Sequence, residues 1–184
     1  MDITRLEEIL NIGENISIEF KHCGNGIESD VYETVCSFLN RFGGDILMGV
    51  KDDGSLCGIP SNASKTMVKN FISCVSNPGI FQPTIYLEPE IIDYQGKTFI
   101  HVHVNPSAEV HSFKKEIFDR VNDADVHITA TAQIAQMYIR KQSIFTEKKI
   151  YPYVELTDLR LDLLPIVRRL AEYNRRHTRM AEIR

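Results

Sequence analysis

The chain has 184 residues, a hydrophobic content of 43% and a formal net charge of −4. This length and composition suit one globular domain with a short appended segment. No apolar run approaches the roughly 18 residues of a membrane span, and the motif Gly-x-x-x-x-Gly-Lys-Ser/Thr of ATP-binding P-loops is absent. We therefore expect a cytoplasmic protein with no membrane association and no bound ATP.

The first predicted elements are a helix, a strand and a second helix. Apolar residues at helical spacing predict an amphipathic helix over residues 3–10 rather than a signal peptide. After Gly13, apolar and polar residues alternate over residues 16–21, which predicts a half-buried strand. A helix that begins near residue 29 should then extend to the glycine pair at 43–44.

Strands become more frequent in the second part of the sequence. Because several of them are joined by tight turns, we predict an α+β fold with a mixed, largely antiparallel sheet and helices packed against it. The elements expected after the glycine pair are a strand at 46–50, a turn at 52–54, a strand at 55–59, a helix through 67–75, strands at 84–94, 97–104 and 116–121, and a helix at 131–139.

The C-terminal part differs from the rest in charge. Residues 140–184 contain eleven Lys and Arg and six Asp and Glu, whereas residues 1–139 contain ten and nineteen. A basic segment on an acidic body can bring one face close to phosphates, although a solvated helix explains these charges equally well. We expect residues 1–140 to form the main domain and residues 141–184 a linker and a basic C-terminal helix.

Three glycines are expected at structural turns. Gly43 and Gly44 lie between a predicted helix and a predicted strand, and Gly54 lies in the turn after that strand. Glycine suits such positions because it adopts positive φ angles at little cost. A second interpretation of the glycine pair is a phosphate site with exposed backbone amides.

Three carboxylates are candidates for catalysis. Glu14 precedes the first predicted strand, Glu19 lies on it, and Asp52 follows the strand after the glycine pair. If these strands are neighbours, the carboxylates converge and could hold Mg²⁺ or Mn²⁺, which polarises a phosphodiester and activates water. Alternatively, Glu19 pairs with Lys21 or with the region of Arg41, and Asp52 is an ordinary turn residue.

Other metal-binding patterns are weak in this sequence. The four cysteines form no Cys-x-x-Cys pair, so we expect neither a zinc ribbon nor a thioredoxin-type redox site. His101 and His103 alternate with valines and should therefore point to the same face of a strand. That spacing could hold a metal, but we interpret it as a polar sheet face.

Several segments resemble the motifs of a known family. They are IEFK at 18–21, FLNRFGGDILMGVKDDG at 38–54, NPS at 105–107 and IFDRVND at 117–123. Their order and spacing are similar to those of the Schlafen-type, Alba-like DNA-binding domain family, over about residues 5–140. This chain departs from the usual motifs at four positions, which are Arg41, Phe42, Val110 and Asn122.

The resemblance implies a nucleic-acid-binding module that binds DNA or RNA, such as the DNA-binding domain of a bacterial transcriptional regulator. In the ribonuclease members of the family, Glu-x-x-x-x-Glu and a later Asp form the active site, and Glu14, Glu19 and Asp52 match these positions. A metal-dependent endoribonuclease is therefore the first alternative. Vertebrate Schlafen proteins pair two such lobes, so we expect a homodimer, and a dimerisation or protein-interaction module is the second alternative.

Six basic residues are candidates for contact with phosphate groups, through the planar fork of Arg or the flexible point charge of Lys. Each of them could equally be a surface salt-bridge partner. The candidates are Lys21, Arg41, Lys51, Arg120, Arg140 and Lys141.

Overall fold

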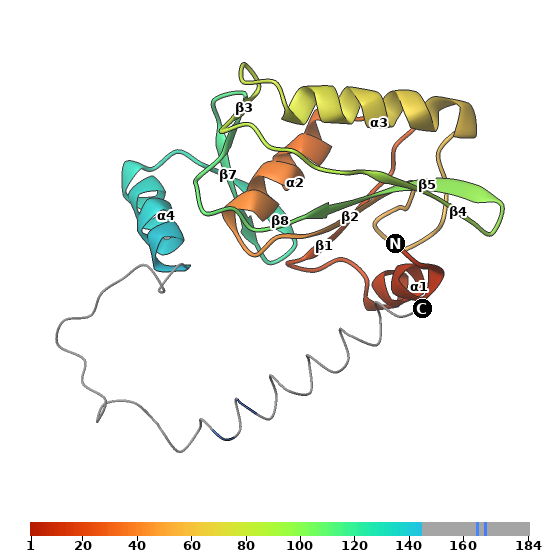
Figure 1. The fold of residues 1–184 in the computed structure, drawn as a ribbon, viewed down its shortest axis with the longest axis horizontal. Coiled ribbons are helices and arrows are strands. Elements are labelled where there is room, and N and C mark those ends of the chain that lie inside the picture. The colour runs from red at the N-terminus through yellow and green to blue at the C-terminus, as the bar shows by residue number, and fades with distance from the viewer. Residues whose placement is uncertain (145–164, 166–167, 169–184) are drawn as a thin grey trace. The chain divides into compact units, whose positions relative to one another are not determined.

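A four-stranded mixed sheet lies at the centre of the described structure (Figure 1). The computed structural model describes residues 1–144 together with residues 165 and 168. The strand order is β1-β2-β5-β4, in which β1 and β2 are parallel and the other two pairings are antiparallel. The strands are β1 (Ile18–Lys21), β2 (Gly44–Met48), β4 (Glu90–Tyr94) and β5 (Lys97–Val104).

Helices cover both faces of this sheet. Side chains alternate along a strand, so Ile46 and Met48 of β2 join one core while Leu47 joins the other. The first core is completed by α2 and α3, and the second by Leu6 and Ile9 of α1. The helices are α1 (Ile3–Ile12), α2 (Ser29–Asn40), α3 (Ser61–Val75) and α4 (Thr131–Ile144).

Two small ribbons complete the described fold. One pairs β3 with β6, and the other pairs β7 with β8 and packs its strand β7 along α2. Helix α4 closes a third, small core through Met137, which packs with Val110 and Ile128. The ribbon strands are β3 (Phe81–Gln82), β6 (Ser112–Phe113), β7 (Ile117–Val121) and β8 (Ala124–Ile128).

The predicted α+β fold with a mixed, largely antiparallel sheet is confirmed, but two predicted strands differ. Residues 55–59 form only isolated bridges, at Leu56 and Ile59, and not a strand. The strand expected at 84–94 begins only at Glu90, directly after Pro89, because proline has no N–H to donate to a ladder. Helix α4 continues beyond residue 140, and the expected C-terminal helix lies outside the described residues apart from positions 165 and 168.

Close packing accounts for the two glycines at 43 and 44, in place of the alternative of a phosphate site with exposed amides. Gly43 has a φ of 75° and donates its N–H to the carbonyl of Phe38 at 2.9 Å, which ends α2. A Cβ on Gly44 would lie 2.5 Å from the carbonyl oxygen of Ser17 and 2.6 Å from the Phe38 ring. Gly54 has a φ of 80° and closes a turn onto Lys51. All three glycines thus occupy turns or tight contacts.

No helix in the described part of the chain is long and apolar enough to cross a membrane.

Candidate nucleic-acid site

The carboxyl ends of β1 and β2 lie at the same edge of the sheet, because the two strands are parallel and Lys21 pairs in register with Met48. His22 follows β1, and Lys51 and Asp52 follow β2. Together with Asp53 they line a shallow hollow of about 360 Å³. The topology therefore gathers basic and acidic side chains from distant parts of the sequence at one place.

Glu14 lies beside the outer edge of β1. Its carboxylate accepts the backbone N–H of Phe20 at 3.0 Å, a group that no neighbouring strand pairs with. Burial raises the pKa of Glu14, and the nearby negative charges of Glu19 and Asp52 raise it further against the hydrogen bond from Phe20. Two of the carboxylates that we selected from the sequence, Glu19 and Asp52, therefore lie within electrostatic reach of the third, Glu14.

Glu19 is buried, and a cation contacts each of its carboxylate oxygens. Nζ of Lys21 lies 2.6 Å from Oε1, and Nη2 of Arg120 lies 2.5 Å from Oε2. Lys21 also reaches Asp30 at 3.1 Å. Burial by itself would lower the pKa of Lys21, but the two carboxylates outweigh it and raise the pKa. The charge of Glu19 is thus balanced within the protein.

Arg120 is wholly buried, with 0% of its side chain exposed. Its guanidinium joins Glu19 on β1 to Asp125 on β8 at 3.0 Å and donates to the carbonyl of Asn15 at 3.0 Å. It also stacks over the ring of Phe38, 5.1 Å from the centroid. Arg120 therefore fastens the β7–β8 ribbon to the sheet and has no surface to offer a phosphate.

Three other residues that we predicted to contact phosphate instead hold α4 and β7 in place. Arg41 and Arg140 converge on Asp119 at 3.1 and 3.0 Å. Lys141 is 2% exposed and donates to the carbonyls of Leu39 at 2.5 Å and Ser107 at 2.8 Å. Burial, helped by the charge of Arg140, lowers the pKa of Lys141 to about 8.

These contacts reduce the number of predicted basic residues that a phosphate can reach. Arg120 and Lys141 are inaccessible to a phosphate in this structure, because both side chains are buried among protein partners. Arg41 and Arg140 are partly exposed but paired. Lys51 is exposed and Lys21 is partly exposed, and these two lie beside the carboxylates.

The carboxylates do not form a ready metal site as their side chains stand. Across the described residues, no group of three or more His, Cys, Asp or Glu has an arrangement that could hold a metal ion. Glu19 would first have to exchange Lys21 or Arg120 for a metal, since these cations contact both of its oxygens. The carboxylates are brought near one another, but ligand geometry is not preformed.

A second charged cluster, centred on Asp45, was not selected from the sequence. Asp45, on β2, accepts hydrogen bonds from His101 and His103, each at 2.8 Å, and from Arg5 at 3.2 Å. The signal that could have found it was the alternation of the two histidines, which we interpreted as a polar sheet face. Their partner could not be predicted, because β2 and β5 lie far apart in the sequence.

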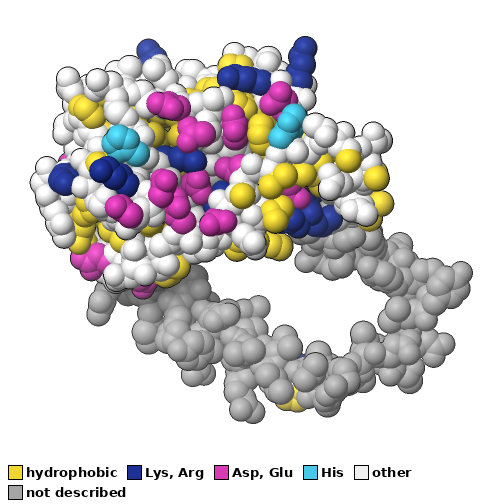
Figure 2. Space-filling view, turned by 180° about the vertical axis from the view of Figure 1, so that it is seen from behind, with side chains coloured by type: hydrophobic (Ala, Val, Ile, Leu, Met, Phe, Trp, Pro, Cys, Tyr) yellow, Lys and Arg dark blue, Asp and Glu magenta, His cyan; other side chains and the backbone are white. Residues whose placement is uncertain are grey.

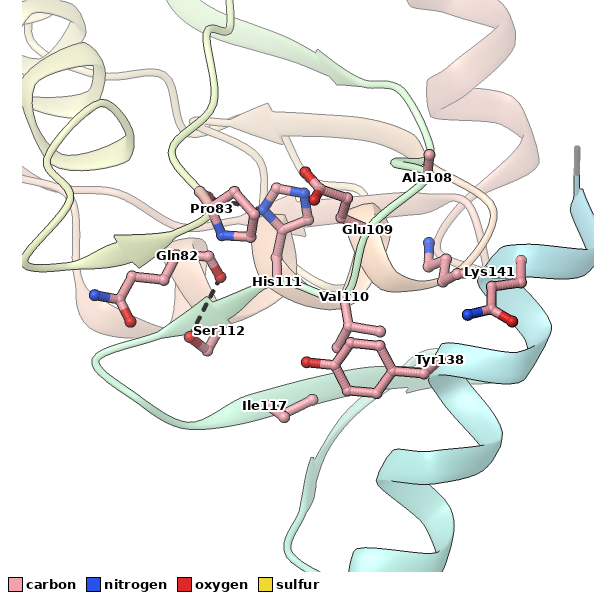
Figure 3. Close-up of a pocket in the computed structure, with 11 residues that line it drawn as sticks. Gln82, Pro83, Ala108, Glu109, Val110, His111, Ser112, Ile117, Tyr138 and Lys141 are labelled. Carbon is pink, nitrogen blue, oxygen red and sulfur yellow. Dashed lines mark hydrogen bonds between the residues drawn. The ribbon is translucent and has the colours of Figure 1, made fainter.

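A pocket of about 560 Å³ lies between α4 and the loops at 82–83 and 108–112 (Figure 3). His111 pins these loops together: its Nδ1 donates to the carbonyl of Pro83 at 2.9 Å, so its Nε2 accepts from Ser107 Oγ at 2.7 Å. Burial lowers the pKa of His111, which favours this neutral form. The pocket shares no lining residue with the carboxylate site.

Comparison with known proteins places the chain in a family. No curated protein matches it at a significant level. The crystal structure of the DIP2311 protein from Corynebacterium diphtheriae shares its fold, with a TM-score of 0.57 and 15% identity over 77% of this chain; the chain spans 32% of that protein's length. The solution structure of the N-terminal domain of a RecG-related protein from Nitrosomonas europaea is 22% identical, with a TM-score of 0.43, over 68% of this chain and 91% of that one. The family model described as Schlafen, AlbA_2 matches residues 14–129, and the chain therefore belongs to this family.

Proposed function

We propose that this chain is a nucleic-acid-binding module whose binding face includes the carboxyl ends of β1 and β2. The observation that carries the proposal is the convergence of family motifs at this edge. Glu19 and Lys21 of the first motif pair with each other, and Lys51 and Asp52 of the second motif line the hollow at the same edge. The buried Arg120 of the last motif holds Glu19 from behind. Segments far apart in the sequence thus meet at this edge, the last of them through a buried side chain.

The sequence divides its charges unevenly between residues 1–139 and residues 140–184. Residues 1–139 carry nineteen acidic and ten basic side chains, and Figure 2 shows Asp and Glu gathered around Lys and Arg on the face that it displays. A phosphate backbone therefore needs more positive charge than the described body supplies. The nine Lys and Arg of residues 142–184 provide it in sequence terms, and we include this segment in the proposal.

The finer role follows from the family resemblance and is also a proposal. The module acts in the cytoplasm as the DNA-binding domain of a bacterial transcriptional regulator, and it works as a homodimer that pairs two lobes. Sedimentation equilibrium at micromolar concentration tests the dimer. A strictly monomeric mass contradicts the pairing and leaves nucleic-acid binding to be judged by itself.

Binding is tested with labelled single-stranded RNA and duplex DNA across a salt series. We expect affinity to fall as salt rises, because each neutralised phosphate releases a counterion, with a slope of roughly −0.7 to −0.9 per phosphate contact. Lys51→Ala should weaken binding, whereas Lys65→Ala, an exposed lysine on α3, should not. Failure to bind either nucleic acid at low salt would overturn the proposal.

A metal-dependent endoribonuclease is the second candidate, favoured by the electrostatic proximity of Glu14, Glu19 and Asp52. A divalent metal held there would polarise a phosphodiester, while one carboxylate takes the proton of the attacking water. Asp52→Asn is the sharpest variant, because Asp52 is exposed and its change should leave the fold intact. Its exposed neighbour gives the matched control, Asp53→Asn.

The expected result for this candidate is RNA cleavage with Mn²⁺ that Asp52→Asn abolishes and Asp53→Asn preserves. Intact RNA with both Mn²⁺ and Mg²⁺ would exclude the enzyme and leave the binding module. Glu19→Ala is less informative, since it removes one of the two carboxylates that pair with the buried Arg120 and can unfold the protein.

A further inference from the structure

On the α1 side of the sheet, Asp45 is a hub for three donors. Nε2 of His101 and Nδ1 of His103 both lie 2.8 Å from its Oδ1, and Nη2 of Arg5 lies 3.2 Å from its Oδ2. Burial would raise the pKa of Asp45, but the two histidine hydrogen bonds outweigh burial and lower the pKa to about 2. Asp45 is therefore a permanent carboxylate above this value and fixes the donors around it.

The hub orients His103 toward solvent. Because an ionised carboxylate only accepts hydrogen bonds, Nδ1 of His103 must carry the proton that faces Asp45. Nε2 is then the outward atom of a ring whose side chain is 55% exposed. Arg5, with 50% of its side chain exposed, lies against the same carboxylate. Arg5 also pairs with Glu8 at 3.3 Å, so two carboxylates orient its guanidinium at the surface.

These side chains line a hollow of about 330 Å³ that is distinct from the carboxylate site. Its walls come from the end of α1, the following loop and the glycine pair, and Phe42 stands at its margin with 64% of its surface exposed. Phe42 precedes Gly43, where a Cβ would clash with the carbonyl oxygen of Val104, so Gly43 packs closely against β5. The guanidinium of Arg41 lies over the Phe42 ring, 5.8 Å from its centroid, and the remaining surface of the ring is open to solvent.

The combination of groups indicates one kind of ligand. An exposed ring offers a stacking surface to a planar base, which every nucleobase can use irrespective of sequence. The guanidinium of Arg5 donates hydrogen bonds to phosphate oxygens, and Nε2 of His103 does so when the ring takes up a second proton, since Nδ1 carries the proton of the neutral ring. Phe42, Arg5 and His103 occur together in this hollow. The described residues that line the hollow of the carboxylate site include neither Phe nor Tyr.

We propose that this hollow binds an unpaired nucleotide, with its base stacked on Phe42 and its phosphate facing Arg5 and His103. This inference rests on the proposed nucleic-acid function and deepens it by naming single-stranded or frayed nucleic acid as the ligand. It adds a second contact surface on the opposite face of the sheet from Glu19 and Lys21. Free nucleoside monophosphate has the same chemistry and is the other source of such a group.

The test uses the full chain, which contains no tryptophan, and an RNA oligonucleotide that contains 2-aminopurine, whose fluorescence changes when it stacks. Phe42→Ala should abolish the fluorescence change and weaken binding roughly tenfold, from the usual stacking contribution. Phe42→Leu should behave similarly, since it keeps an apolar side chain but removes the ring. Tyr86→Ala removes an aromatic residue that is 88% exposed elsewhere, and it should change neither quantity.

The phosphate contact is tested by His103→Leu, which removes the ring nitrogens and should reduce affinity for a 5′-phosphorylated oligonucleotide more than for its 5′-hydroxyl counterpart. Adenosine monophosphate, titrated in parallel, shows whether a free nucleotide suffices. Equal binding by the parent, Phe42→Ala and Phe42→Leu would overturn this inference while the proposed function stands. Equal competition by poly-glutamate would overturn it in favour of an acidic peptide, and no binding by the parent would overturn both.

Discussion

The two faces of strands β1 and β2 carry charged clusters that differ in how completely they are paired. On the α2 side, Glu19 and Arg120 are both buried, and further partners surround each of them. On the α1 side, Asp45 is buried, but Arg5 and His103 leave about half of their side chains in solvent. The first cluster is closed and stabilises the fold, whereas the second is open and can meet a ligand.

This difference shows that a residue's charge and motif position do not fix its role. Arg120 belongs to a family motif and was one of the six candidates for phosphate contact, yet it is wholly buried and paired with Asp125 of the β7–β8 ribbon. Asp45 also lies in a motif, yet the sequence alone gave no reason to select it. Burial on all sides makes an ion pair structural, and partial exposure leaves donors available for binding.

The largest effect is expected from opening the closed cluster. Arg120→Met should lower the free energy of unfolding by about 3–5 kcal/mol, because it removes the cation that the buried Glu19 and the partly buried Asp125 share and leaves Glu19 with Lys21 alone. Urea denaturation measures the change. The double variant Glu19→Gln/Arg120→Met should recover part of the loss, and a single-variant cost below about 1 kcal/mol would contradict a closed structural cluster.

A smaller and pH-dependent effect is expected at the open cluster. The pKa of Asp45 is lowered in the folded state from 3.8 to about 2, so its contribution to stability is present above pH 3.8 and lost as the pH falls toward 2. Between pH 4 and 2 the parent should lose about 2 kcal/mol more than Asp45→Asn. Parallel curves of unfolding free energy against pH for the two proteins would show that the hydrogen bonds to Asp45 do not lower its pKa.

The smallest effect is expected at the exposed edge of the open cluster. Arg5→Gln should change the free energy of unfolding by less than about 1 kcal/mol, because half-exposed ion pairs are screened by solvent. The same change should weaken binding of a 5′-phosphorylated oligonucleotide. A large loss of stability, measured by urea denaturation, would instead show that Arg5 holds α1 to the sheet. Both clusters would then be structural.

Local patterns predicted most of the sheet and its helices. Alternation over residues 16–21 and the apolar run at 46–50 predicted β1 and β2, and helical spacing predicted α1 and α2. The short strands β3 and β6 were missed, because two residues are too few to show a period. Strand β8 was missed as well, because its alternating residues are only weakly apolar and most of its side chains are exposed.

The candidate site was predicted in its residue types and in part in its geometry. Glu14, Glu19 and Asp52 were chosen from motif positions, and the structure brings the charges of Glu19 and Asp52 within reach of Glu14. The engagement of both Glu19 oxygens by Lys21 and Arg120 could not be predicted, because Arg120 lies about a hundred residues away. That contact decides whether the carboxylates are free for a metal.

The sequence by itself determined the family, the α+β class and the acidic body with its basic C-terminal segment, because these follow from motifs, hydrophobic periods and charge counts. Only the tertiary structure decided which charges are buried. The parallel pairing of β1 with β2 and the packing of the β7–β8 ribbon set the dielectric surroundings and the partners of each group. Those surroundings close the cluster around Glu19 and leave the cluster around Asp45 open.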